Sequence, residues 1–173
     1  MGLQKEHWMM IILALVFMVL SIYYPWVNYD RLPEMIPTHF DLAGKPDAWS
    51  EKSLGHLLVG PLITVITLLI MVVIAWWMAG VEDPRRVING PKERIKKMSQ
   101  ERAEKIRSMA VFHTLLIMLL VSLVIMNVSI GQIQIASGYR ENMGWGNMVI
   151  VALLIADAIY LTWQSVRLIY KSG

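Results

Sequence analysis

Four long apolar stretches constrain the fold of this chain more than any other feature of its sequence. They cover roughly residues 8–27, 54–79, 109–130 and 147–170. Each has about 20 residues or more, which allows a helix to cross a hydrocarbon core of about 30 Å. The stretches are continuously apolar rather than alternating, so they predict helices and not the strands of a barrel. We therefore predict an all-α polytopic membrane protein, built as a bundle of four transmembrane helices.

The composition agrees with a membrane protein of one domain. Of the 173 residues, 56% are hydrophobic and 17% are charged, whereas soluble domains average about 45–50% apolar and about 25% charged residues. We expect a single membrane domain over residues 1–173. The chain has no cysteine, which excludes a thiolate metal site and a cysteine nucleophile.

Basic residues predict the orientation of the bundle in the membrane. The segment 80–108 between the second and third spans carries Arg85, Arg86, Lys92, Arg94, Lys96, Lys97, Arg102, Lys105 and Arg107. The positive-inside rule therefore places this connector and both termini in the cytoplasm. The loop 28–53 then lies outside. The net charge of +3 is modest and divided between the two sides, which argues against nucleic acid as a partner.

The connector itself has helix-start signals at Asp83-Pro84 and Gly90-Pro91, because proline is favoured at the first helical position. We predict a helix that begins near Lys92 and continues into the third span. The basic residues between 85 and 107 form a candidate surface for anionic lipid or for a cytoplasmic regulator. The alternative is a solvated segment that only determines topology, since acidic residues dilute the basic ones.

Asp157 lies near the middle of the fourth span, where an ionisable group is costly and is a functional candidate by default. Tyr160, Gln164 and Arg167 follow at helical spacing. We therefore expect these four side chains to share one face of the helix, and this face to point into the bundle.

Counting from the cytoplasmic ends of antiparallel spans predicts the neighbours of Asp157. It comes level with Ser122 of the third span and Thr67 of the second, and His113 comes level with Gln164. A hydrogen bond from a protonated Asp157 to a hydroxyl would hold the helices together, a contribution of about 0.6–2 kcal/mol. The alternative is a proton relay or small transporter, but the repeats and midplane breaks typical of transporters are not evident.

The first outer loop, 28–53, is too long for a minimal connection between two helices. Pro33, Pro37 and Pro46 forbid a continuous helix, Gly44 marks a turn, and residues 38–40 read as a short extended piece. We expect an ordered cap, and ordered loops often carry function. The candidate residues for binding a ligand or partner are His39, Phe40, Asp41, Asp47, Trp49 and Lys52.

A metal site in the same loop is a weaker alternative. His39 and Asp41 alternate, so they would face the same side of a strand. Together with Asp47 and His56 they are candidate ligands for zinc or another divalent cation. The chain has no H-E-x-x-H motif. A His39 that is hydrogen bonded within the cap and fixes its turn explains the same residues, and we expect no cofactor.

Residues of this loop also carry a family resemblance. The resemblance rests on Leu32-Pro33, Ile36-Pro37-Thr38-His39-Phe40, Gly44, Asp47, Trp49 and Lys52. The pattern resembles the bacterial membrane domain of unknown function 1648, which also forms the N-terminal domain of SdpI-type immunity proteins, and it covers about residues 1–70. The resemblance implies a bacterial or archaeal plasma-membrane protein that protects against, or senses, a membrane-active toxic peptide. It supplies no catalytic residues.

Four functions remain open from the sequence. The first is a non-catalytic binding or sensing protein, in which the cap recognises a peptide, a lipid or a membrane-protein partner and the connector reports the change. The second is a small accessory subunit of a larger membrane complex. The third is a metal-dependent enzyme at the outer surface, and the fourth is a small transporter built on Asp157. The ligand and the oligomeric state are left open.

Overall fold

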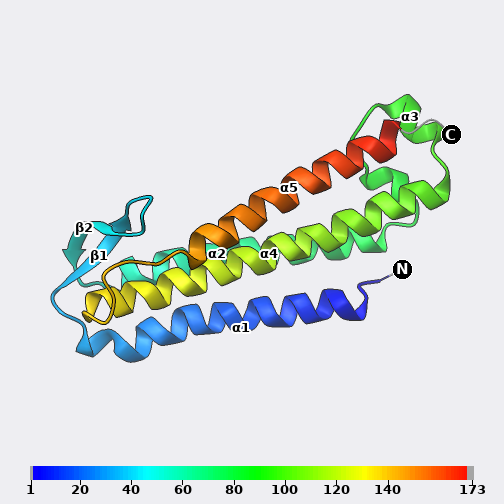
Figure 1. Cartoon of the computed structure of the whole chain (residues 1–173). Helices are drawn as coiled ribbons and strands as arrows, with labels where there is room; N and C mark the ends of the chain where they lie inside the picture. The colour runs from blue at the N-terminus through cyan, green and yellow to red at the C-terminus, as the bar shows by residue number, and fades with distance from the viewer. Residues whose placement is uncertain (1, 171–173) are drawn as a thin grey trace.

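The computed structural model describes residues 2–170. Four of its helices are long and apolar enough to cross a membrane: α1 (Lys5–Asn28), α2 (Leu54–Gly80), α4 (Gln100–Ala136) and α5 (Gly146–Tyr170) (Figure 1). The prediction of a multi-pass bundle of four membrane helices is thereby confirmed. The short elements are η1 (Tyr29–Arg31), β1 (Met35–Phe40), β2 (Pro46–Glu51), η2 (Pro84–Val87) and α3 (Lys92–Lys97).

Helix α4 is the centre of the bundle, because it packs against α1, α2 and α5. The largest apolar cluster joins α1, α2 and α4, and includes Ala14, Leu68 and Leu115. Helix α5 lies along α4 on the side away from α1 (Figure 1). Its most apolar stretch has no buried residue, so most of its surface is available to lipid.

The bundle has two chemically different ends. We call the end with β1, β2 and the α4–α5 loop the hairpin end. The opposite end, with η2 and α3, is the connector end, where α1 begins and α5 finishes (Figure 1). Segments of one chain that follow four antiparallel helices must alternate between these ends, so the hairpin and the connector lie on opposite sides of the membrane.

The connector departs from the prediction of one helix running from Lys92 into the third span. Helix α3 stops at Lys97, Met98 is extended, and α4 starts anew at Gln100. The break has two physical causes. The Ser99 hydroxyl accepts a hydrogen bond from the Arg102 amide at 3.3 Å, as an N-cap residue does, and Met98 is buried beside Ile169 of α5.

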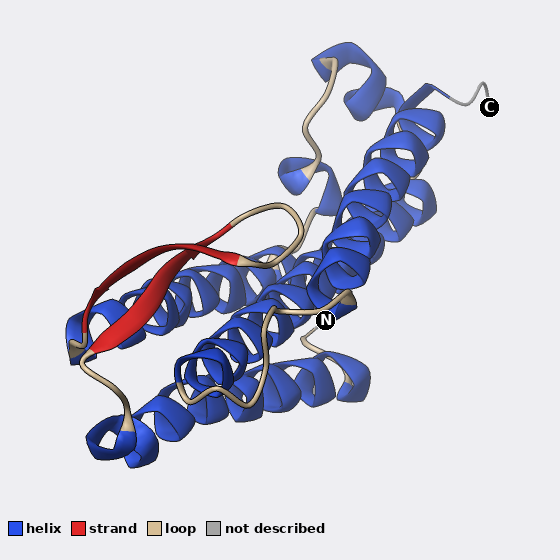
Figure 2. Ribbon diagram, turned by 60° about the vertical axis from the view of Figure 1, so that its left-hand side comes forward, coloured by secondary structure: helices blue, strands red, loops and turns tan. Residues whose placement is uncertain are grey.

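The loop expected to be an ordered cap is a β-hairpin, with β1 antiparallel to β2 (Figure 2). The extended piece predicted at 38–40 falls inside β1. The register is irregular at Thr38 and again at Asp47, because Pro37 pairs with Trp49, His39 with Ala48 and Phe40 with Pro46. Such bulges bend a strand and redirect its side chains.

Candidate functional site

An exposed histidine–carboxylate pair lies at the second bulge of the hairpin. His39 Nδ1 is 2.6 Å from Asp47 Oδ1, and the two side chains are 70% and 46% exposed. Exposed pairs of this kind contribute little to stability, so the contact mainly fixes how the bulge presents its side chains. This agrees with the interpretation of His39 as a residue hydrogen bonded within the cap.

The hairpin is attached to the bundle by a buried amide. Gln132 of α4 donates a hydrogen bond from Nε2 to the carbonyl oxygen of Pro37 at 2.7 Å, and its side chain is almost completely buried. Beside it, Ile36 is fully buried in a cluster with Leu57 and Ile133. Strand β1 is therefore fixed on α4 by both apolar packing and a hydrogen bond.

Lys52, a predicted ligand contact, joins the two ends of the hairpin segment. Its Nζ donates to the carbonyl of Leu32 at 3.1 Å and lies 5.3 Å from the centre of the Tyr29 ring. A lysine that caps a carbonyl and covers an aromatic ring stabilises the loop entry. The structure thus gives Lys52 an internal, structural contact.

The hairpin tip has a second attachment, to the α4–α5 loop. The Met143 amide donates to the carbonyl of Gly44 at 2.8 Å, and Gly44 has a positive φ of 75°. Asp41 accepts a hydrogen bond from the Lys45 amide at 2.8 Å and so closes the tip turn. Both ends of the hairpin are therefore held, while the face with Trp49 remains 46% exposed and Phe40 is half-buried.

The structure does not bring the four weak metal-ligand candidates together. Only His39 and Asp47 meet. Asp41 is engaged in its own turn, and His56 Nδ1 lies 3.0 Å from the hydroxyl of Ser50. Within residues 2–170 no group of three His, Cys, Asp or Glu side chains is placed to hold a metal ion.

A second histidine–carboxylate pair lies between α4 and α5, inside the membrane. His113 Nδ1 is 2.6 Å from Asp157 Oδ1, and each side chain is only 11% exposed. The second carboxylate oxygen of Asp157 is buried and has no hydrogen-bond partner. The Tyr160 ring lies against His113, with 5.5 Å between ring centres. Asp157 therefore has an interhelical partner, as predicted, but the partner is His113 and it engages only one carboxylate oxygen.

The predicted neighbours of Asp157 were wrong. Ser122 and Thr67 donate to carbonyls of their own helices, those of Met118 at 2.9 Å and Ile63 at 3.0 Å. Gln164 contacts Tyr160 of the same helix at 3.4 Å rather than His113. Ser122 is buried, whereas Thr67 is exposed.

The error has a simple geometric origin. The prediction of depth assumed that the cytoplasmic ends of the third and fourth spans, near residues 109 and 170, lie level. However, α4 begins at Gln100, and its first turns pack against the end of α5 through Ala103, Ile106 and Ile169. Ser122 therefore lies nine residues beyond the true partner position on α4, about 13 Å at 1.5 Å per residue. The predicted inward face is also only partly right, because Tyr160 and Arg167 are exposed.

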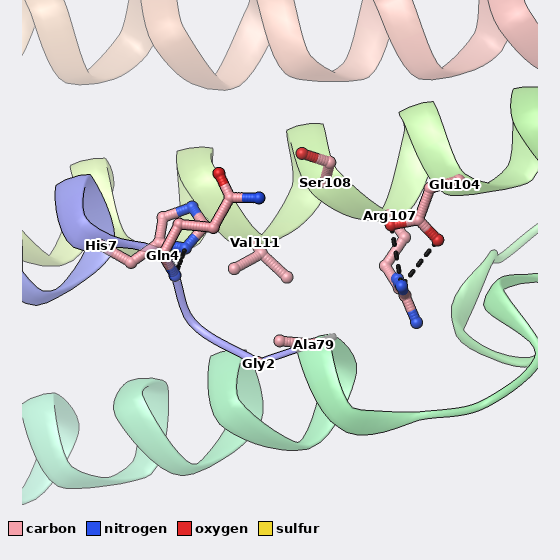
Figure 3. Close-up of a pocket in the computed structure, with 8 residues that line it drawn as sticks. All are labelled: Gly2, Gln4, His7, Ala79, Glu104, Arg107, Ser108 and Val111. Atoms are coloured by element: carbon pink, nitrogen blue, oxygen red, sulfur yellow. Dashed lines mark hydrogen bonds and ion pairs between the residues drawn. The ribbon is translucent and has the colours of Figure 1, made fainter.

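A buried polar cluster at the connector end escaped the sequence prediction (Figure 3). Arg107 of α4 is 5% exposed, forms an ion pair with Glu104 at 2.6 Å and donates to the carbonyl of Val81 at the end of α2. His7 is buried nearby and accepts a hydrogen bond from the Gln4 amide at 3.0 Å.

The spacing of Arg107 from apolar residues in the sequence could have predicted this cluster. Ala103, Arg107 and Val111 recur every four residues and are all buried, so Arg107 lies on an apolar face and not on the solvated one. A cationic side chain on the last carbonyls of α2 also complements the dipole of that helix. The small cavity beside it, about 20 Å³, holds about one water molecule, so we assign the cluster a structural role.

The Gln132 contact leads to a stability prediction. Gln132→Leu leaves the Pro37 carbonyl without its donor, and a buried unsatisfied group costs about 1–3 kcal/mol. We expect the hairpin to open locally, so hydrogen exchange of the amides in 35–51 should accelerate. Asn127→Leu is the control, because the Asn127 amide donates only within α4, to Leu123. Equal protection of the hairpin in both variants would contradict this attachment.

Comparison with known proteins agrees with the family resemblance. Residues 16–65 match the family model of a domain of unknown function (DUF1648). The matched segment contains the second half of α1, the whole hairpin and the first part of α2. No curated protein and no solved structure matches the chain. The hairpin and the adjoining parts of α1 and α2 are thus the part of the chain that matches this family model.

Proposed function

We propose that this chain is a non-catalytic binding or sensing protein whose hairpin captures an extended peptide segment at the outer face of a bacterial or archaeal plasma membrane. The observation that carries the proposal is an unpaired strand edge on a hairpin that is attached at both ends. The orientation follows from the basic residues of the connector, which favour the cytoplasmic side for that end and for both termini. The DUF1648 domain contains the whole hairpin, and this supports a role for the hairpin itself.

The unpaired edge belongs to β2. The Lys52 amide donates to the carbonyl of Glu34 at 2.7 Å, which makes that pair hydrogen bonded. Because such pairs alternate along an antiparallel ladder, Trp49 opposite Pro37 directs its own N–H and C=O away from β1. Within residues 2–170 the sheet has two strands only, so the edge at Trp49 is a template for a further strand.

Strand β1 has an outward-facing edge of the same kind, and this edge already accepts a hydrogen bond from the bundle. Pro37 lies opposite Trp49, so its carbonyl points away from β2, and there it accepts the hydrogen bond of Gln132. One edge of the hairpin is thus occupied by the bundle and the other is free. The Trp49 indole, 46% exposed, adds an aromatic anchor beside the free edge, as at many recognition sites.

Helix α4 supplies a route from the hairpin to the opposite side of the membrane. It is continuous over 37 residues, contacts the hairpin through Gln132 and holds α5 through His113. A bound peptide would change the connector end only if the bundle has two states that differ in affinity for it. Under this proposal the SdpI-like role is immunity to, or signalling of, a membrane-active peptide.

The decisive variants separate the backbone edge from the indole. Trp49→Ala removes only the side chain, whereas Trp49→Pro also removes the outward N–H, and proline is tolerated on edge strands. Tagged full-length protein would be purified from native membranes in mild detergent, and bound peptides identified by mass spectrometry. We expect Trp49→Pro to retain about fivefold less partner than Trp49→Ala, since it lacks one further hydrogen bond.

A variant at the tip serves as the control for this experiment. Leu42→Ala changes a side chain that is 92% exposed but lies outside β2, so it should retain the partner at the wild-type level. A partner that binds all four proteins equally would contradict edge recognition. A protein recovered in fixed stoichiometry with all of them would favour the alternative of an accessory subunit in a larger membrane complex.

A further inference from the structure

The connector end contains a basic pocket that the proposed function does not use. It lies between η2 and α3, has a volume of about 430 Å³, and we call it the connector pocket. Its charged lining residues are Asp83, Arg85, Arg86, Lys92 and Lys96. Four cations face one carboxylate, so the pocket has a strongly positive potential.

Of the four cations, Lys96 is paired with Glu93, whereas within residues 2–170 no ion pair joins Arg85, Arg86 or Lys92 to a carboxylate. The Asp83 carboxylate accepts a hydrogen bond from the Arg85 amide at 3.0 Å and thereby caps η2. Lys96 lies 3.5 Å from Glu93, both exposed. The Arg85 Nε is buried without a hydrogen-bond partner, and a buried donor left unsatisfied is unfavourable.

The pocket is expected at the depth of lipid headgroups. It follows directly after α2, whose last turns expose Trp76 and Trp77, as in the aromatic belt of a membrane interface. On its other side, Gly90 packs close to Ile169 of α5, and the Arg94 guanidinium lies 4.5 Å from the centre of the Tyr170 ring. The ends of two membrane helices therefore flank the pocket.

We infer that the connector pocket binds the phosphate of an anionic phospholipid. Arginine forks suit phosphate oxygens, and their charge-assisted hydrogen bonds are the strong ones. Ile88 and Ile95 add apolar surface to the lining, which suits the glycerol backbone of a lipid better than a free phosphate ion. Basic pockets beside membrane helices are known lipid sites. The inference stands independently of peptide binding at the hairpin.

The test is lipid binding to the purified full chain, followed by native mass spectrometry. Phosphatidylglycerol, zwitterionic phosphatidylcholine and inorganic phosphate are the three probes. Arg85→Gln/Arg86→Gln removes two charges from the pocket, and Lys97→Gln/Lys105→Gln removes two from exposed connector positions outside its lining. We expect the pocket variant to bind phosphatidylglycerol about tenfold more weakly, and the control to stay near wild type.

A third variant, Arg85→Lys/Arg86→Lys, keeps the two positive charges but loses the guanidinium geometry. Residual lipid binding by this variant would also show that substitutions at these two positions do not unfold the connector. Intermediate affinity in this variant, with phosphatidylcholine bound weakly throughout, supports a built site. An equal loss in the pocket variant and in Lys97→Gln/Lys105→Gln would show diffuse attraction and overturn the inference. Displacement of phosphatidylglycerol by inorganic phosphate at comparable concentration would also overturn it, in favour of a soluble anion.

Discussion

Replacing Asp157 by leucine is expected to detach α5 from α4 and to lower the free energy of unfolding by about 2 kcal/mol. The variant leaves the His113 imidazole buried without its 2.6 Å partner. Helix α5 is unusually dependent on this contact, because it packs mainly against α4 and exposes most of its surface. Unfolding in detergent micelles, followed by tryptophan fluorescence, would measure the loss.

A double-mutant cycle identifies the cause of that loss. His113→Leu and Asp157→Leu each leave one orphaned polar group, whereas the double variant leaves none, so it should be more stable than the sum of the two losses predicts. Asp157→Asn keeps an acceptor for the imidazole N–H and should lose least. Strictly additive losses would show that the two side chains stabilise the helices separately, through contacts other than their shared hydrogen bond.

The same pair shows what a single sequence can and cannot predict about depth. The need of Asp157 for an interhelical partner is predictable from its position in a span, because the hydrocarbon of the bilayer forms no hydrogen bonds with polar groups. Which partner it finds depends on where α4 begins and how the end of α5 packs against its first turns. That packing involves Met98 and Ile169, more than 60 positions apart in the chain, and no local pattern predicts it.

The hairpin likewise depends on long-range contacts that local sequence patterns do not predict. Its prolines and Gly44 predict an ordered, non-helical segment, because their backbone restrictions are local. The strand pairing is not local. It depends on Gln132, which reaches Pro37 across 95 positions, and on Met143 in the α4–α5 loop. The spans were predictable from composition, whereas the hairpin surface proposed to bind a ligand is held in place by residues from the second half of the chain.

Replacing Gly44 by alanine is the second change with a large expected effect. Its φ of 75° is left-handed, where a residue with a Cβ is disfavoured by roughly 1–2 kcal/mol. The added methyl group would also lie 3.0 Å from Met143 Cβ, in the contact that holds the hairpin tip. We expect the tip to leave the α4–α5 loop, with faster hydrogen exchange at Met143, whose amide donates to Gly44.

Gly138 provides a matched control for this effect, because it has the same φ of 75° but no atom within 4 Å of an added Cβ. Gly138→Ala therefore carries the backbone strain alone, and the difference between the two variants isolates the close approach to Met143. If tip docking holds the β2 edge in place, Gly44→Ala should weaken capture of the peptide partner and Gly138→Ala should not. Equal hydrogen exchange at Met143 in both variants would show that the tip contact contributes nothing beyond strain, and that Gln132 and the packing of Ile36 attach the hairpin without it.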